Sequence, residues 1–198
     1  MALELELKYL DPDLGFLRGL LESLGARSMG RYFEENLVFD DGDRSLKGKD
    51  VLLRLRSRKG ESILTVKKPP QVEVDSRLKV FEELETAVHD FGIMKSILES
   101  LGFGVAFAYE KVREKWELED CFICLDTLPF GNFVEIEGSE KGVPRCAGML
   151  HLAPEQASKL TYHALNLEYR EANGLQPDES FVFENGEKLE LLRRIGKE

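Results

Sequence analysis

Charged side chains recur at every second position in successive strand-like segments of this chain. The first segment, MALELELKYL, alternates Glu4, Glu6 and Lys8 with leucines, and a strand places such alternate residues on one face. The other charged positions are Arg54 and Arg56, Lys67, Glu83 and Glu85, Lys111 and Arg113, Asp126, and Glu135 and Glu137. Since the opposite parity is mostly apolar, the pattern predicts a sheet with one apolar face and one face of six basic and seven acidic groups.

This charged face has two interpretations. It could be an ordinary solvated surface, but like charges two residues apart repel each other and need opposite charges, a metal or anions nearby. Alternatively, the sheet curls until this face lines a cavity, and helices cover the apolar face outside. Carboxylate oxygens suit Mg²⁺ or Mn²⁺, and Arg and Lys suit phosphate oxygens. Such a cavity would suit a metal-bound polyphosphate.

The composition limits the classes of partner. The 198 residues carry a formal net charge of −10, which disfavours non-specific nucleic-acid binding but allows a local basic site. No apolar run is long enough for a membrane span, and no signal peptide is visible. The odd set of Cys121, Cys124 and Cys146 fits packing residues in a reducing compartment. We therefore expect a cytoplasmic protein without nucleic-acid or membrane partners.

Helical segments flank the strand-like ones. Asp11 and Pro12 are predicted to start a leucine-rich helix that ends at Gly25, and Asp90 a second helix that ends at Gly102. A third helix is predicted from Pro154 onward. The tail is ambiguous, because Asn185-Gly186 favours a hairpin turn whereas LELLRRIG favours a helix.

The chain also contains an internal repeat. Residues 6–26 align with residues 83–103 without a gap, so that Glu6 falls on Glu83, Asp13 on Asp90, and ESLG on ESLG. Each copy reads as a strand, a helix and further strands. One domain built from two similar halves explains this better than two domains joined by a linker.

The ordered motifs resemble the CYTH superfamily, the triphosphate tunnel metalloenzymes. ELELK at 4–8 matches the ExExK signature, followed by RLR at 54–56, TVK ending at Lys67, ELE at 83–85, KVR at 111–113, CLDTL around Asp126, EIE at 135–137 and a late tyrosine, Tyr162. The resemblance implies an α+β fold: a closed eight-stranded antiparallel β-barrel flanked by helices, with two pseudo-symmetric halves. It implies a single CYTH domain over residues 1–170 and a C-terminal extension, residues 171–198, that packs on or near the barrel.

The resemblance also implies a role for each charged position. Glu4, Glu6, Glu135 and Glu137 would hold the metal, Mg²⁺ or Mn²⁺. The triphosphate would be bound by Lys8, Arg54, Arg56, Lys67, Arg77, Lys111 and Arg113, and Arg77 would close over it from a proline-rich loop together with Lys79. The candidate catalytic groups are Glu6, Lys67, Glu85 and Asp126. Glu85 and Asp126 have the alternative role of holding neighbouring bases in place.

The reaction stays open at this stage. The layout is most like that of class IV adenylate cyclases, which would convert ATP to cyclic AMP and pyrophosphate. The alternatives are hydrolysis by an inorganic triphosphatase or a thiamine triphosphatase, and a non-catalytic polyphosphate- or nucleotide-binding protein. The expected partner is therefore a nucleoside, inorganic or organic triphosphate. A homodimer is compatible with the sequence.

Overall fold

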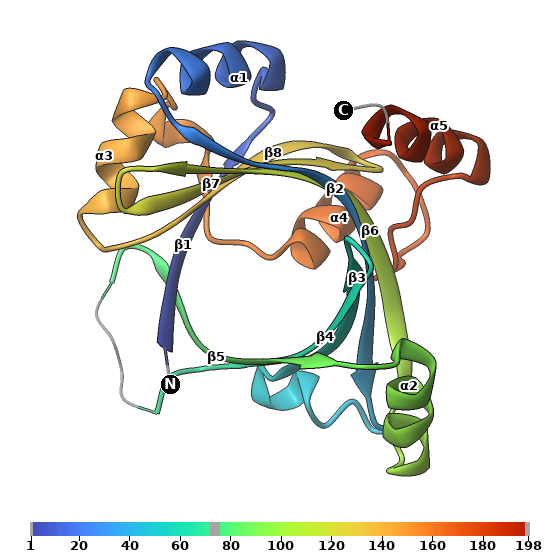
Figure 1. Cartoon of the computed structure of the whole chain (residues 1–198). Helices are drawn as coiled ribbons and strands as arrows, with labels where there is room; N and C mark the ends of the chain where they lie inside the picture. The colour runs from blue at the N-terminus through green and yellow to red at the C-terminus, as the bar shows by residue number, and fades with distance from the viewer. Residues whose placement is uncertain (1, 72–75, 197–198) are drawn as a thin grey trace.

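The computed structural model describes residues 2–71 and 76–196, and in them eight strands close into an antiparallel barrel (Figure 1). The strands are β1 (Ala2–Leu10), β2 (Arg27–Asp40), β3 (Leu52–Arg58), β4 (Glu61–Lys68), β5 (Lys79–Val88), β6 (Gly104–Leu118), β7 (Cys121–Leu128) and β8 (Gly131–Glu137). They neighbour one another in the order β5-β4-β3-β2-β6-β7-β8-β1, and β1 pairs again with β5. This last pairing closes the sheet, which confirms the predicted fold.

Local chemistry explains the tight turn between β3 and β4. The two central residues, Lys59 and Gly60, have φ angles of 48° and 76°. Positive φ at both positions is the requirement of a type I′ turn, which matches the right-handed twist of the two strands. The resulting register places Arg54 opposite Thr65 and Leu52 opposite Lys67, so the polar side chains of the hairpin share one face.

The hydrophobic core lies on the outer face of the barrel. Leu21 of α1 (Leu14–Ser23) and Cys146 of α3 (Gly142–Met149) are fully buried against outward-facing residues such as Ile136 of β8. On another side, Leu98 of α2 (Phe91–Ser100) packs in a cluster with Leu55 of β3. All three cysteines are buried free thiols, as predicted. Helices therefore cover the apolar residues on the outer face of the strands, and the charged residues at the alternate positions face inward.

The two copies of the sequence repeat have the same local structure. The Asp13 side chain caps α1 by accepting from the Phe16 N–H at 3.0 Å, and Asp90 caps α2 by accepting from the Ile93 N–H at 2.8 Å. The prediction that Asp11 caps the first helix was wrong. Asp11 lies in the preceding turn with a φ of 50°, so the helix begins two residues later than the sequence pattern indicated.

The later helices differ from the sequence prediction. The helix expected from Pro154 begins only at Tyr162, as α4 (Tyr162–Ala172), because residues 154–158 form a 3₁₀ turn and the short strand β9 (Ala157–Ser158) beside β1. Sequence reasoning missed α3, whose GVPRCAGM contains two glycines and a proline. Its burial against β7 and β8 outweighs this poor helix propensity. Asn185-Gly186 opens the helix α5 (Asn185–Ile195) and forms no hairpin.

The C-terminal segment packs on the outside of β6. Phe181 exchanges backbone hydrogen bonds with this strand: its N–H donates to the Ala108 carbonyl at 3.1 Å, and its carbonyl accepts from the Glu110 N–H at 3.0 Å. Lys188 of α5 then pairs with the Glu110 carboxylate at 2.6 Å. Among the described residues, no helix is both long and apolar enough to cross a membrane.

We predict that Gly138→Ala destabilises the protein by about 1–3 kcal/mol through overpacking. Gly138 follows β8, and a Cβ there would lie 2.5 Å from the Sγ of Cys121 and 3.3 Å from the Asp120 carbonyl oxygen. Gly19→Ala in α1 is the matched control, because its Cβ meets nothing within 4 Å and should stabilise the helix by about 0.5–1 kcal/mol. Urea denaturation measures both, and equal effects of the two substitutions would contradict the packing argument.

Candidate active site

The interior of the barrel is a cavity of about 770 Å³. The described residues that line it include eleven Lys and Arg side chains against nine Asp and Glu side chains. A chain with a net charge of −10 therefore concentrates a small excess of positive charge at this one place. Such a wall attracts an anion, and the carboxylates among the cations leave room for a metal ion as well.

Most of the residues predicted from the sequence line this cavity. They are Glu4, Glu6, Lys8, Arg54, Arg56, Lys67, Glu85, Lys111, Arg113, Glu135 and Glu137. Two others do not. Arg77 is exposed and lies outside the lining, next to the undescribed residues 72–75, so its closing role stays a prediction. Asp126 is completely buried behind the wall of the cavity.

Three carboxylates converge where β1 meets β8. Glu6 lies opposite Glu137 in the strand pairing, and Glu4 is the next inward residue of β1. Each of these three offers an oxygen, and the oxygens all lie within 4.8 Å of one another. Burial and the nearby Glu135 charge raise the pKa of Glu137 to about 7. A divalent cation would relieve this crowding of negative charge, so the donor set fits Mg²⁺ or Mn²⁺.

Glu135, predicted as a fourth metal ligand, is held by cations instead. Its carboxylate lies 2.9 Å from the Lys8 Nζ and accepts a 2.9 Å hydrogen bond from Arg113. Burial would raise the pKa of Glu135, but Lys8 and Arg113 keep it well below its usual range. The structure thus brings together three of the four predicted ligands and pairs Glu135 with Lys8 and Arg113, so its role as a metal ligand stays a prediction.

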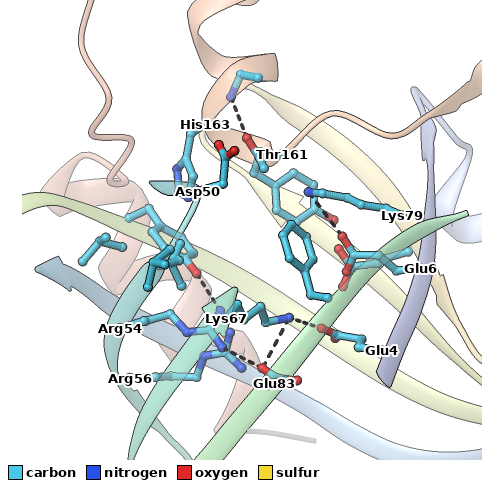
Figure 2. Close-up of a pocket in the computed structure, with 18 of the residues that line it drawn as sticks. Glu4, Glu6, Asp50, Arg54, Arg56, Lys67, Lys79, Glu83, Thr161 and His163 are labelled. Carbon is cyan, nitrogen blue, oxygen red and sulfur yellow. Dashed lines mark hydrogen bonds and ion pairs between the residues drawn. The ribbon is translucent and has the colours of Figure 1, made fainter. Parts of the chain in front are cut away.

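Lysines pair with two of these carboxylates, Glu4 and Glu6 (Figure 2). The Lys67 ammonium pairs with Glu4 and, at 3.3 Å, with Glu83, and Lys79 lies 3.7 Å from Glu6. Burial would lower the pKa of Lys67, but the Glu4 and Glu6 carboxylates raise it, so this lysine stays charged. Burial and repulsion from other lysines lower the pKa of Lys79 to about 8.

The two arginines of β3 form the next part of the wall. Arg54 donates to the Tyr109 hydroxyl at 3.1 Å, and Arg56 donates to the Asn36 side-chain oxygen at 2.8 Å. The Arg54 Nε is buried and has no hydrogen-bond partner among the described residues. Planar guanidinium groups bind phosphate oxygens in a bidentate manner, so unused N–H donors here are suited to a phosphate chain.

Lys111 and Arg113 are fixed from behind by Asp126. This carboxylate accepts from the Lys111 Nζ at 3.1 Å, from Arg113 at 2.7 and 2.6 Å, and from the Tyr162 hydroxyl at 2.8 Å. Because Asp126 is fully buried and outside the cavity lining, the geometry favours the second of its two predicted roles, holding bases in place.

Comparison with known proteins identifies the family of this chain. The CYTH domain family matches residues 2–143. The chain belongs to the CYTH family. A Methanocaldococcus jannaschii protein named "Putative adenylate cyclase" is 30% identical over 138 residues, which cover 69% of this chain and 77% of the relative.

Solved structures share the fold of this CYTH protein. A Vibrio parahaemolyticus structure, described as a putative adenylate cyclase, is 21% identical with a TM-score of 0.74 and matches over 82% of this chain and 97% of its own. A Hippeastrum protein, described as a putative adenylyl cyclase that reveals a dominant triphosphatase activity, is 19% identical with a TM-score of 0.60 over 90% and 99% of the two chains. At these identities the likeness concerns the fold.

Sequence reasoning missed Glu34, a fully buried acid of this CYTH barrel. Its carboxylate lies 3.5 Å from the Arg56 Nε and 3.7 Å from the Lys111 Nζ. Burial would raise the pKa of Glu34, but Arg56 and Lys111 keep it well below its usual range. The alternation of Tyr32, Glu34 and Asn36 could have revealed it, but the adjacent Glu35 obscured which parity faces inward.

We predict that Asp126→Asn destabilises the protein by about 3–5 kcal/mol, because it removes the buried negative charge that Lys111 and Arg113 share. Urea denaturation gives the free energy of unfolding. Glu190→Gln is the matched control, since it removes a carboxylate from an exposed pair with Arg194 and should change stability by less than about 1 kcal/mol. An Asp126→Asn protein as stable as the control variant would contradict the positioning role.

Proposed function

We propose that this CYTH protein is a divalent-metal-dependent enzyme that acts on a triphosphate inside its barrel, and that it converts ATP to cyclic AMP and pyrophosphate. The observation that carries the proposal is the closeness of two chemistries in one cavity. Glu4, Glu6 and Glu137 offer oxygens for a metal ion, and the facing walls carry arginines and lysines for phosphate oxygens. The name of the M. jannaschii relative, a putative adenylate cyclase, supports cyclisation as the reaction.

The proposed reaction asks mainly for positioning and charge stabilisation. The 3′-hydroxyl of ATP attacks the α-phosphorus, the bond from this phosphorus to the bridging oxygen breaks, and pyrophosphate leaves. Arg54, Arg56 and Lys111 would bind the phosphates and stabilise the charge that moves to the leaving group. The metal ion, when bound, would act as a Lewis acid on the phosphate oxygens.

The hydroxyl proton needs an acceptor among the residues of the cavity. Burial and the charge of Glu4 raise the pKa of Glu83, although Lys67 partly opposes them. A carboxylate with a raised pKa is a better base than Glu6, whose pKa stays below its usual value because Lys8 outweighs the effect of burial. We therefore assign proton acceptance to Glu83 and metal binding to Glu6.

Hydrolysis is the second candidate. The same cavity would serve if water replaces the 3′-hydroxyl as the attacking group, and the product is then orthophosphate. The Hippeastrum neighbour supports hydrolysis as a candidate, because its description names a dominant triphosphatase activity. Inorganic triphosphate and thiamine triphosphate are its candidate substrates.

A product assay tests both reactions. The purified protein is incubated with Mg²⁺ or Mn²⁺ and, separately, with ATP, inorganic triphosphate or thiamine triphosphate. Cyclic AMP with pyrophosphate is the expected result. Orthophosphate from any of the three, without cyclic AMP, would replace cyclisation by hydrolysis, and the absence of any product would overturn the enzymatic proposal.

We predict that Glu6→Gln lowers metal-dependent turnover by about 100-fold or more, because it removes a charged metal ligand from the carboxylate cluster. The fold should remain, since Gln has the same shape, and circular dichroism and thermal unfolding check this. Glu190→Gln on the exposed face of α5 is again the control and should leave turnover unchanged. If Glu6→Gln turned over every triphosphate at the normal rate, the assigned metal site would be wrong.

We predict that Mn²⁺ binds more tightly as the pH rises from 5.5 to about 7 and that the affinity then levels off. Glu137 has a pKa raised to about 7, so below this pH it holds a proton that the metal must displace. The apparent affinity should fall by up to about tenfold per pH unit in this range. Isothermal titration measures it, and Glu137→Gln should bind weakly with a flatter profile. A flat profile in the unmodified protein would contradict the prediction.

A further inference from the structure

One end of the cavity is apolar and aromatic. The apolar side chains that line it are Val38, Leu52, Ala106, Phe107, Ala164 and Leu167. Val38 pairs with Phe107 on β2 and β6, and the charged inward residues Lys111 and Arg113 follow further along β6. The N-terminal turn of α4 supplies another wall, and Figure 1 shows α4 inside the outline of the barrel near β2 and β6. Phosphate groups gain nothing from such a surface, so it suits a different part of a ligand.

His163, in the first turn of α4, is a polar group that lies among these apolar side chains. Its ring centroid lies 4.4 Å from that of Phe107 and 5.1 Å from that of Tyr109, both in edge-to-face arrangements. Figure 2 shows His163 close to Thr161 and far from Glu4 and Glu83. The ring therefore belongs to the end of the cavity away from the carboxylate cluster, and aromatic contacts fix its orientation.

The described part of the chain leaves one ring nitrogen of His163 without a hydrogen bond. Its Nδ1 is buried and has no partner among the described residues. Burial and the nearby Arg54 charge lower the pKa of His163 to about 3, so the imidazole is neutral at physiological pH. A neutral imidazole carries one N–H donor and one acceptor nitrogen. Since buried polar groups nearly always find partners, an unsatisfied one in a cavity wall is a reason to look for a ligand.

The surrounding charges select the type of ligand. Arg44 and Lys47 both pair with Glu179 at this end of the cavity, and Arg44 also lies 5.9 Å from the Phe107 ring centroid. The positive charge that keeps His163 neutral also disfavours a cationic group, such as the thiazolium ring of thiamine triphosphate. A neutral, planar heteroaromatic ring carries no positive charge that these cations would repel. It packs on apolar and aromatic side chains and has the ring nitrogens that an imidazole can pair with.

We propose that His163 is a specificity-determining residue that recognises the neutral heteroaromatic base of a nucleoside triphosphate, held in place by Phe107 and Tyr109. The inference rests on the proposed function, which puts the phosphates at the arginines and lysines. β6 connects the two parts, because Phe107, Tyr109, Lys111 and Arg113 are alternate residues of one strand. The seven residues from Phe107 to Arg113 span roughly 20 Å, which is long enough for an extended nucleoside triphosphate.

The test compares two ligands that share the phosphates and differ in the base. ATP and inorganic triphosphate are titrated calorimetrically against the full-length protein and against His163→Phe and His163→Asn. His163→Phe keeps an aromatic ring but removes both nitrogens, whereas the amide of His163→Asn retains a donor and an acceptor. His89→Phe, at an exposed position outside the cavity, is the matched control.

We expect His163→Phe to weaken ATP binding by about 5- to 10-fold, with inorganic triphosphate unchanged, because one neutral hydrogen bond is lost. His163→Asn should recover part of the ATP affinity, and His89→Phe should change neither ligand. Equal weakening of both ligands would show a merely structural role and overturn the inference, as would unchanged ATP binding by His163→Phe or equal affinity of the unmodified protein for the two ligands.

Measurements of binding and of turnover distinguish a failure of this inference from a failure of the proposed function on which it rests. The titration needs no reaction, so selective ATP binding through His163 without any product would overturn the proposed enzyme and support the inference. Conversely, metal-dependent turnover that persists while His163→Phe binds ATP normally would overturn the inference and support the proposed function.

Discussion

The pairing of β1 with β5 is the constraint on which the rest of the structure depends. It closes the sheet and brings Glu4 and Glu6, near the beginning of the chain, beside Lys79 and Glu83. In an open sheet the same side chains would face water, where exposed ion pairs contribute little and a metal ion or phosphate chain would have no enclosed site. Closure therefore turns an amphipathic sheet into a cavity, and it forces the hydrophobic core to form outside, under α1, α2 and α3.

A barrel that is charged inside stays folded because its buried charges hold one another in place. Lys8 lies between Glu6 at 2.6 Å and Glu135 at 2.9 Å, and Asp126 holds Lys111 and Arg113. Such pairs offset the cost of taking charges out of water, but they give little net stability. Under the proposed function, a metal-bound triphosphate would exchange only for partners that line the cavity: the ion would take over Glu4 and Glu6, and the phosphates would take over Lys67, while Asp126 and Glu135 keep their cations. The cations need no large movement, since they are already oriented.

The sequence predicts the charged wall well because strand alternation is a local property. Period-two spacing was enough to place Arg54 and Arg56, or Glu135 and Glu137, on the inner face. Which of them touch one another depends on register and closure, so the sequence could not show that Glu135 pairs with cations while Glu137 joins Glu4 and Glu6. Glu34 was missed because Glu35 is adjacent to it, so that the charge pattern did not show which alternate residues of β2 face inward. The start of α4 was misplaced because β9 and a 3₁₀ turn occupy residues that carry helical signals.

His163 was passed over for a different reason: a single histidine in a helix is uninformative until its neighbours are known. Those neighbours, Phe107, Tyr109 and Phe181, come from parts of the chain far apart in sequence. The family match ends at residue 143, so α4 and the C-terminal segment lie outside it, whereas the strands with the carboxylate cluster and the facing arginines and lysines lie within it. The two parts of the cavity are nevertheless coupled, because Tyr162 of α4 donates to Asp126, which holds Lys111 and Arg113. Under the proposed function, substitutions of His163 would alter the group accepted beside the phosphates, whereas substitutions of Tyr162 would also disturb the cations that bind the phosphates.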